Sequence, residues 1–179
     1  RNFSGILENI ENIVKNSNVP VIVKETGCGI SKKTCEKLLN VGVKYIDISG
    51  FGGTNFIEIE NLRRTDLDFT NIYGWGIPTA KCIIDCRSIS KDFTLIGSGG
   101  IKTGEDIAKA IILGSDMTAI AGEVLRYLVH GGYKFAEDYL KSLIYQTKMI
   151  MLLLGVRNIE ELKKVEYKIF GKLKDILNY

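Results

Sequence analysis

The hydrophobic pattern of the chain alternates between short apolar runs and longer segments with helical periodicity. In the helical segments, apolar residues recur three and four positions apart, whereas the apolar runs are too short for a helix. The pattern predicts helices over 3–16, 31–42, 103–112 and 123–128, a helix that starts within 75–80 and runs through 86, and further helix from 132 onward. Strands are expected at 21–25, 45–49, 94–97 and 117–122. Only the stretch 56–77 gives mixed signals.

Four strand-then-helix units in succession predict a parallel sheet joined by right-handed crossovers. Each strand ends in small, polar or charged residues, which is where a (β/α)8 TIM barrel carries its chemistry. We therefore expect an α/β chain that supplies about the last four β/α units of such a barrel. Residues 1–131 would form units five to eight, and 132–179 a helical extension.

This assignment leaves the barrel incomplete, because a full one needs about 250 residues. Half a barrel would expose two parallel edges and an apolar inner face. Either another chain completes it or the parent protein is longer, and we favour the longer parent.

A glycine-rich turn lies between the third strand and the next helix. Ser98, Gly99 and Gly100 turn the backbone, and Thr103 is placed to cap the helix. Free backbone N–H groups and a helix dipole at such a turn favour an anion, and Lys102 can add a full positive charge. We interpret this turn as a phosphate site; an ordinary strand-to-helix loop is the alternative, because glycine turns are common.

Composition and charge narrow the function classes. The 179 residues are 45% hydrophobic and 25% charged, with a formal net charge of +3. This charge is too small to indicate nucleic-acid binding, and no basic run is interleaved with aromatic residues. The most apolar stretch, 149–156, is too short to span a membrane. The start lacks both an initiator Met and the apolar core of a signal peptide.

The four cysteines, Cys28, Cys35, Cys82 and Cys86, show no CxxC spacing. With a single histidine, this pattern argues against a zinc site. Cys82 and Cys86 lie four apart on one helix face, where cysteine acts as a small hydrophobic residue. Reduced thiols in a cytoplasmic protein are the simplest interpretation.

Two other polar features have ordinary explanations. His130, beside two glycines, is interpreted as a helix cap rather than as a catalyst. The pair Arg63 and Arg64 either reaches a diphosphate or lies on a solvated loop.

Several strings of the chain resemble the type 2 isopentenyl-diphosphate isomerases, which are FMN-dependent TIM barrels. The opening string is Arg1-Asn-Phe-Ser-Gly-Ile-Leu-Glu-Asn-Ile10. The later strings, in order, are Pro20-Val-Ile-Val-Lys-Glu25, Gly42-Val-Lys-Tyr-Ile-Asp-Ile-Ser-Gly50, Gly52-Gly-Thr-Asn55, Trp75-Gly-Ile-Pro-Thr-Ala80, Ser98-Gly-Gly-Ile-Lys-Thr-Gly104 and Ile107-Ala-Lys-Ala110. The resemblance covers about residues 1–155. The serine–glycine turn recurs across many FMN barrels, and the Val-Lys-Glu and Gly-Gly-Thr-Asn strings narrow it to this family.

The resemblance implies a set of cofactor-binding residues. Lys24 would lie beside the N1 edge of the flavin, where an ammonium stabilises the anionic reduced form. The alternative is a structural lysine that pairs with Glu25 or with a helix end. Ser49 and Thr54 match hydroxyl residues around the cofactor, with loop capping as their alternative. The backbone cradle for the FMN phosphate would comprise Gly99, Gly100, Ile101, Lys102, Ala121 and Gly122. Lys102 stands where the family more often has Arg. An arginine can form two hydrogen bonds to one phosphate, whereas a lysine offers a single compact positive charge.

The resemblance also implies a reaction, the interconversion of isopentenyl and dimethylallyl diphosphate by an allylic proton shift in isoprenoid biosynthesis. The cofactors would be FMN, active when reduced by NADPH, and Mg²⁺ on the diphosphate. The family's metal and substrate residues lie upstream of this chain, so no catalytic residue is assigned here and the chain alone is expected to be an incomplete enzyme. A homo-oligomer is expected, without nucleic-acid or membrane partners.

Two alternatives remain open at this point. One is another FMN-binding TIM-barrel oxidoreductase, although the segment Gly50-Phe-Gly-Gly-Thr54 lacks the histidine of the hydroxy-acid oxidases and Cys28 lies in the wrong unit for a dehydrogenase nucleophile. The other is a non-catalytic half-barrel that binds a phosphate ligand. Flavin absorbance separates a holoprotein from a bare scaffold.

Overall fold

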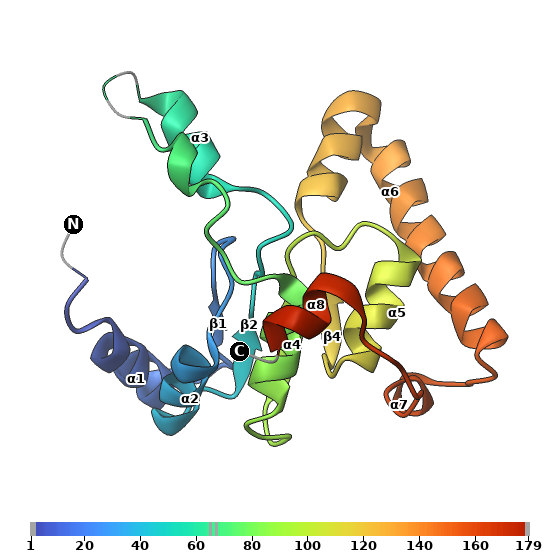
Figure 1. Cartoon of the computed structure of the whole chain (residues 1–179), viewed down its shortest axis with the longest axis horizontal. Coiled ribbons are helices and arrows are strands. Elements are labelled where there is room, and N and C mark those ends of the chain that lie inside the picture. Colours follow the sequence, from blue (N-terminus) through green and yellow to red (C-terminus); the bar gives the residue numbers. More distant parts are fainter. Residues whose placement is uncertain (1–2, 65, 67, 178–179) are drawn as a thin grey trace.

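The fold is a parallel α/β arrangement, in agreement with the sequence pattern (Figure 1). The computed structural model describes residues 3–64, 66 and 68–177. Outside the described residues lie Arg1 and Asn2 of the resembling string, Thr65 and Leu67 of the stretch 56–77, and Asn178 and Tyr179 of the predicted extension. One sheet contains four strands in the order β1-β2-β3-β4, with every pair parallel. The strands are β1 (Ile22–Lys24), β2 (Tyr45–Asp47), β3 (Thr94–Ser98) and β4 (Met117–Ala119).

Helices alternate with these strands and continue beyond them. Their bounds are α1 (Ile6–Asn16), α2 (Lys32–Asn40), α3 (Phe56–Arg63), the 3₁₀ turn η1 (Thr70–Ile72), α4 (Thr79–Arg87), α5 (Gly104–Ile112), α6 (Gly122–Leu153), α7 (Ile159–Leu162) and α8 (Gly171–Leu177). The ambiguous stretch 56–77 therefore holds α3 and η1. No helix in the described ranges is long and apolar enough to cross a membrane.

The last strand and its helix differ in detail from the prediction. β4 ends at Ala119 rather than at 122, and α6 already begins at Gly122. The two helical segments expected on either side of 132 form one element, which bends where Gly132 leaves the helical region (φ 75°, ψ −175°). His130 thus lies inside α6, just before this bend.

The helix after the glycine turn begins with a complete capping box. The Thr103 hydroxyl accepts a hydrogen bond from the Asp106 N–H at 3.1 Å, and the Asp106 carboxylate accepts one from the Thr103 N–H at 3.0 Å. These bonds satisfy amide groups that a helix start leaves without partners, so the predicted cap at Thr103 is confirmed.

Replacing Thr103 by alanine is expected to lower the free energy of unfolding by about 1 kcal/mol, because one capping bond is lost. Urea unfolding followed by circular dichroism measures this change. The matched variant Thr147→Ala removes a hydroxyl that bonds only to the Leu143 carbonyl within α6, and it should cost clearly less. Equal losses in the two variants would contradict the capping role.

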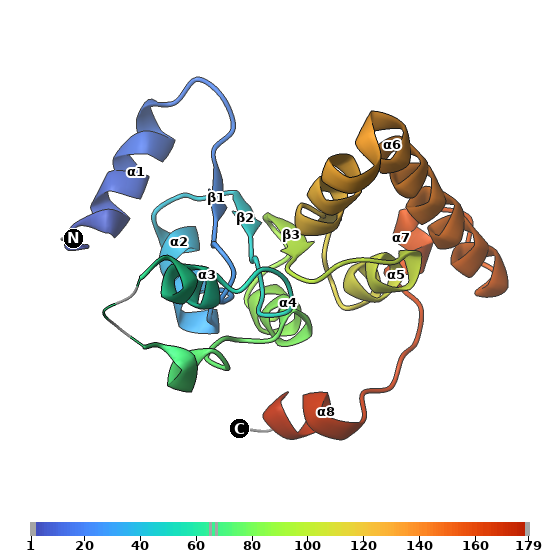
Figure 2. The ribbon, with the colours of Figure 1, turned by 90° about the horizontal axis from the view of Figure 1, so that it is seen from above.

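The core lies between one face of the sheet and the helices that cover it. Ile46 and Leu95 are fully buried there, together with Cys35, Cys82 and Cys86 from α2 and α4. Figure 2 shows α2, α4 and α5 on one side of the strands, with α1 and α6 at the two ends. The cysteines on the shared face of α4 therefore pack as small hydrophobic residues, as expected.

The other face of the sheet is left uncovered toward both edges. Residues paired in register share a side, which groups Ile22 with Tyr45 and Met117 with Ile96. Ile22 on edge strand β1 is 55% exposed and Met117 on edge strand β4 is 51% exposed. Both parallel edges of the sheet therefore carry exposed apolar side chains.

A charged cluster ties the base of the sheet to the helices. The Asp116 carboxylate accepts hydrogen bonds from Arg87 Nη2 at 2.5 Å, from Lys163 Nζ at 2.9 Å and from the Leu95 N–H at 2.8 Å. Burial works to raise the pKa of Asp116, but the bond from Leu95 and the charges of Lys163 and Arg87 outweigh it and hold that pKa below its ordinary value. The ionised form of Asp116 therefore stabilises the fold.

The Asp116→Asn variant is expected to lose about 2 kcal/mol of unfolding free energy at pH 7, because two partly buried cations lose their counter-charge. Since the folded pKa lies below the unfolded value of about 3.9, the stabilisation is complete above that value and disappears as pH falls through the folded pKa. Urea unfolding at pH 7 and pH 3 tests this, with the exposed Asp92→Asn as control. If the difference in unfolding free energy between Asp116→Asn and wild type is as large at pH 3 as at pH 7, the stabilising role of the ionised Asp116 is refuted.

Candidate functional site

Three loops come together at the carboxyl ends of β2, β3 and β4. They are 50–55, 99–103 and 120–121. An added Cβ on Gly53 would lie 3.0 Å from the Gly100 nitrogen, and one on Gly122 would lie 3.5 Å from the Thr54 hydroxyl. Four predicted cofactor residues, Thr54, Gly99, Gly100 and Gly122, are thus brought within contact distance of one another or of the same loop.

The glycine turn after β3 presents backbone donors without acceptors. Within the described part of the chain, the N–H groups of Gly99, Gly100 and Ile101 donate to no protein acceptor, whereas the following N–H groups of Lys102 and Thr103 donate to the Asp106 carboxylate. The turn is held from below by the Thr79 hydroxyl, which donates to the Gly99 carbonyl at 2.5 Å. Unpaired N–H groups on a rigid turn form an anion-binding concavity.

The N-terminus of α6 lies beside this turn, because β3 and β4 are neighbours and Ser98 pairs with Ala119. Its N-cap residue is Ala121, which offers no side chain to the first-turn N–H groups of the helix. The positive end of the α6 dipole therefore adds to the donors of the turn, and an anion placed there would meet both.

Lys102 lies at the rim of this site rather than in it. Its ammonium is 3.7 Å from the Glu123 carboxylate, which also pairs with Arg126 at 2.6 Å. Hydrogen bonds and charge from Arg126, together with Lys102, hold the pKa of Glu123 below its usual range. The positive charge expected from Lys102 is thus shared with a carboxylate in the first turn of α6.

Lys24 ends β1 and points toward the end of β2. Its ammonium donates to the Ser49 hydroxyl at 3.0 Å and to the Glu25 backbone carbonyl at 2.5 Å. Among the described residues, no carboxylate lies within ion-pair distance of Lys24. Lys24 therefore contacts Glu25 through the backbone carbonyl and not through an ion pair with its side chain.

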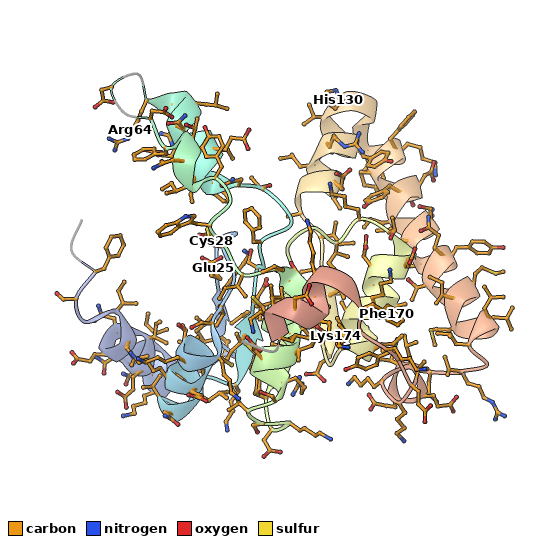
Figure 3. All side chains as sticks on the ribbon, in the orientation of Figure 1. Glu25, Cys28, Arg64, His130, Phe170 and Lys174 are labelled. Carbon is orange, nitrogen blue, oxygen red and sulfur yellow. The ribbon has the colours of Figure 1, made fainter. Side chains whose placement is uncertain are left out.

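The Glu25 carboxylate is engaged elsewhere. It accepts hydrogen bonds from the N–H groups of Gly27, of Cys28 at 2.7 Å and of Gly29 at 3.0 Å, which fixes the loop after β1 (Figure 3). This loop-shaping role was not predicted from the sequence. An acidic residue just before a Gly-x-Gly loop was the available signal.

Ser49 lies in a small buried network after β2. Its backbone adopts a left-handed conformation with φ 36°, and its N–H contacts both the Asp47 carboxylate at 3.2 Å and the Ser98 hydroxyl at 3.1 Å. The Ser98 hydroxyl in turn donates to Asp47. Asp47 and Ser98 were not singled out as site residues from the sequence, although both stand at the carboxyl ends of predicted strands.

The family model described as FMN-dependent dehydrogenase matches residues 4–168. The chain belongs to the FMN-dependent dehydrogenase family. Residues that converge at the strand ends, Lys24, Ser49, Thr54 and the glycine turn, all lie inside the matched range.

This member of the FMN-dependent dehydrogenase family has curated relatives at high identity. It is 50% identical over 172 residues to an isopentenyl-diphosphate delta-isomerase of Bacillus cereus (strain ATCC 14579), and 45% identical over 171 residues to one of Geobacillus sp. (strain WCH70). Each match covers 96% of this chain and 49% of the relative. The chain therefore spans about half the length of these curated relatives.

Solved structures agree on the fold. A mandelate oxidase with 3,3-difluoro-2-hydroxy-3-phenylpropionic acid superimposes with a TM-score of 0.70 at 17% identity, covering 91% of this chain and 44% of the oxidase. A mandelate oxidase with benzoyl-formic acid gives a TM-score of 0.69 at 18% identity over 91% and 43% of the two chains. At these identities the likeness concerns the fold alone.

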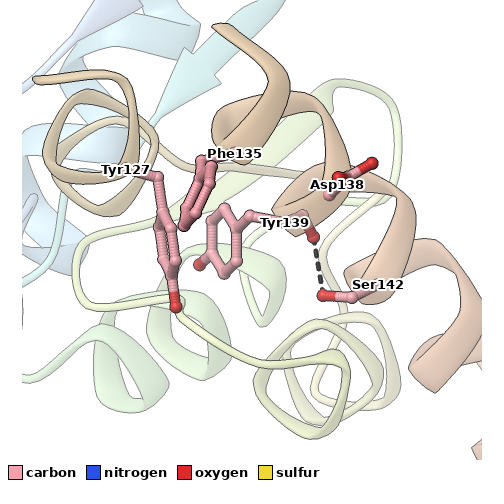
Figure 4. Close-up of a pocket in the computed structure, with 5 residues that line it drawn as sticks. All are labelled: Tyr127, Phe135, Asp138, Tyr139 and Ser142. Carbon is pink, nitrogen blue, oxygen red and sulfur yellow. Dashed lines mark hydrogen bonds between the residues drawn. The ribbon is translucent and has the colours of Figure 1, made fainter. Parts of the chain in front are cut away.

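Two hollows lie next to the loops at the strand ends. One, of about 500 Å³, is bounded by α4, α5 and the C-terminal segment 167–173, and reaches the turn at Gly99 and Gly100. The other, of about 290 Å³, is lined by α6 residues, among which the rings of Tyr127 and Tyr139 stack at 4.4 Å between centroids (Figure 4). The Tyr139 hydroxyl donates to the Lys102 carbonyl at 2.8 Å, so this aromatic pair supports the turn.

The remaining candidate residues are not brought to the turn. Arg63 and Arg64 end α3 and pair with Glu60 on the same helix. Arg64 and His130 lie toward the tips of α3 and of the first part of α6 in Figure 3. No group of three or more potential metal-ligating side chains is found in the described ranges.

Proposed function

We propose that this chain forms the carboxyl-terminal half of a (β/α)8 barrel, with β1 to β4 as barrel strands five to eight. The open edges at Ile22 and Met117 support this assignment, because two further parallel strands would bury them. The match to about half of each relative supports it as well. Residues 1–131 would be the barrel units, and 132–179, which start at the bend in α6, the helical extension.

The half-barrel would bind FMN through its phosphate. The single observation that carries this proposal is the set of unpaired N–H groups at Gly99, Gly100 and Ile101 beside the uncapped start of α6. The residues fit a phosphate, because the turn offers only donors, carries no side chain at its two glycines and lies at a helix N-terminus. Ala121 and Gly122 would add backbone N–H groups, and Lys102 a partly neutralised positive charge.

Lys24 and Ser49 would contact the ring end of the cofactor. The ammonium of Lys24 has no carboxylate partner among the described residues, so it can stabilise negative charge on a bound ring. Thr54, close to Gly122, would contact the cofactor between its two ends. When bound and reduced, the flavin supplies acid–base chemistry to an allylic substrate.

The complete protein would interconvert isopentenyl and dimethylallyl diphosphate, the activity in the names of its relatives. NADPH would reduce the flavin, and Mg²⁺ on the diphosphate would be held by residues of the other barrel half. The role of this chain is then to hold the phosphate, to place Lys24 at the ring and to exclude water from the strand ends. A homo-oligomer remains part of this proposal.

Fragment complementation tests the proposal. The chain is mixed with the part of the Bacillus cereus relative that it does not match, about half of that protein and, on this proposal, its amino-terminal half. We expect the mixture to bind FMN with quenched flavin fluorescence and, under reducing conditions with Mg²⁺, to convert isopentenyl diphosphate into dimethylallyl diphosphate. Each half alone should be inactive.

Three outcomes of this experiment distinguish the parts of the proposal. Association of the halves without FMN binding would refute the flavin site, whereas FMN binding without isomerisation would refute the activity but keep the site. A mixture in which the halves do not associate would refute the barrel assignment.

A further inference from the structure

A buried carboxylate lies at the end of β2 and has no part in the proposed FMN contacts. Asp47 is the last residue of β2 and is only 5% exposed. It pairs in register with Lys24 on β1. It accepts hydrogen bonds from the Ser98 hydroxyl and from the Ser49 N–H at 3.2 Å. Burying a carboxylate costs free energy unless hydrogen bonds or a counter-charge compensate for the lost hydration. The two hydrogen bonds that compensate for it here therefore indicate what Asp47 does.

The hydrogen-bond directions follow from the chemistry of the groups. A carboxylate only accepts, so the Ser98 hydroxyl must donate its proton to Asp47. The lone pairs of Ser98 then face the Ser49 N–H at 3.1 Å. The Ser49 N–H is thus shared by two acceptors, Asp47 and Ser98, which come from two neighbouring strands.

This double contact coincides with backbone strain. Among the described residues, Ser49 is the non-glycine residue with positive φ, at 36°. Side-chain-bearing residues hold such a conformation only where the surrounding contacts enforce it. Asp47 and Ser98 supply that enforcement.

The strained backbone places the Ser49 hydroxyl against Lys24. An ammonium only donates hydrogen bonds, so Ser49 Oγ accepts the bond from Lys24 Nζ, at 3.0 Å, with one of its lone pairs. The proton of the Ser49 hydroxyl must therefore point away from Lys24. The pair presents an ammonium and a free O–H donor side by side at the strand ends.

We propose that Asp47 is a positioning residue for the flavin. Through Ser98 and the Ser49 backbone, it holds the Ser49 hydroxyl so that Ser49 and Lys24 together face one acceptor edge of the ring. This inference rests on the proposed function, since the ring edge is that of the bound FMN. Asp47 itself touches no ligand.

A double-mutant cycle tests the inference in the complemented protein. Asp47→Ala is expected to weaken FMN binding about tenfold, and Asp47→Asn only two- to threefold, because the amide oxygen still accepts from Ser98 and Ser49. Ser49→Gly removes the hydroxyl together with the strain and should also cost about tenfold. The double variant Asp47→Ala/Ser49→Gly should then bind FMN no more weakly than Ser49→Gly alone.

A purely structural role would behave differently. If Asp47 had only a structural role, Asp47→Ala would lower Tm both in the wild-type protein and in Ser49→Gly. The fold losses of FMN affinity caused by Asp47→Ala and Ser49→Gly would then multiply in the double variant. Multiplied losses, or unchanged FMN affinity in a folded Asp47→Ala protein, would overturn the inference.

Amide exchange in the chain without ligand separates this inference from the proposed function. The Ser49 N–H should exchange at least tenfold faster in Asp47→Ala, while amides of the remote helix α2 keep the wild-type rate. Unchanged exchange at Ser49 overturns the positioning role whatever FMN does. A wild-type complemented protein that binds no FMN refutes the proposed function and the flavin part of this inference, and the exchange result still decides whether Asp47 holds Ser49.

Discussion

Gly99→Ala is expected to abolish FMN binding and to lower the free energy of unfolding by about 3 kcal/mol or more. The Gly99 backbone has φ 97°, a region that residues with a Cβ rarely adopt. The added Cβ would also overlap the Gly50 carbonyl and lie 2.6 Å from the Gly50 nitrogen. Both are backbone atoms, so no flexible side chain can move aside. Urea unfolding and FMN titration of the complemented protein measure the two effects.

The matched control is Gly155→Ala. Gly155 also has a positive φ, 69°, but nothing lies within 4 Å of its added Cβ. It should therefore show only the conformational cost of about 1–2 kcal/mol, with unchanged FMN affinity. Equal effects at the two positions would mean that close packing between the loops after β2 and β3 does not shape the site.

Lys24→Met is expected to weaken the binding of reduced FMN about 30-fold, and that of oxidised FMN less than fivefold. A hydrogen bond to a charged group contributes about 1.5–3 kcal/mol, and only the reduced ring is largely anionic. Methionine keeps the apolar stem of lysine but not its charge. Anaerobic titration with each redox form measures the difference.

Protein stability separates this effect from misfolding. Lys24 is exposed and forms no ion pair within the described residues, so the unfolding free energy of Lys24→Met should stay within about 0.5 kcal/mol of wild type. The control Lys15→Met, on α1 and paired with Glu11, should change neither redox form's affinity. If Lys24→Met weakened the binding of reduced and of oxidised FMN equally, the proposed electrostatic role of Lys24 would be refuted.

The parallel α/β fold was predictable because its signals are local. Four apolar runs, each followed by helical periodicity, gave four strands in sequential order in the sheet. Thr103 was expected as a helix cap, and its hydroxyl accepts the Asp106 N–H; Ser31 caps α2 in the same way by accepting the Thr34 N–H. Cap chemistry acts within a few residues, so a single sequence carries it.

The details of the site were less predictable because they depend on contacts between strands. The Asp47–Ser98 bond joins residues 51 positions apart, and nothing in either local sequence selects the partner. The Glu25 carboxylate accepts hydrogen bonds from the loop after β1, a role that the sequence analysis did not assign to it. The end of β4 was placed too late, because Ala121 and Gly122 continue the apolar run although they already begin α6.

The packing of the cysteines gives the chain an internal reporter of its folded state. Cys35, Cys82 and Cys86 are fully buried, so a reagent in solvent does not reach their sulfur atoms, and burial also raises the pKa of Cys82 to about 12. Cys28, in the loop after β1, is partly exposed. An alkylating reagent therefore adds one mass increment to a folded molecule and four to an unfolded one, and mass spectrometry can count the two populations without any engineered label.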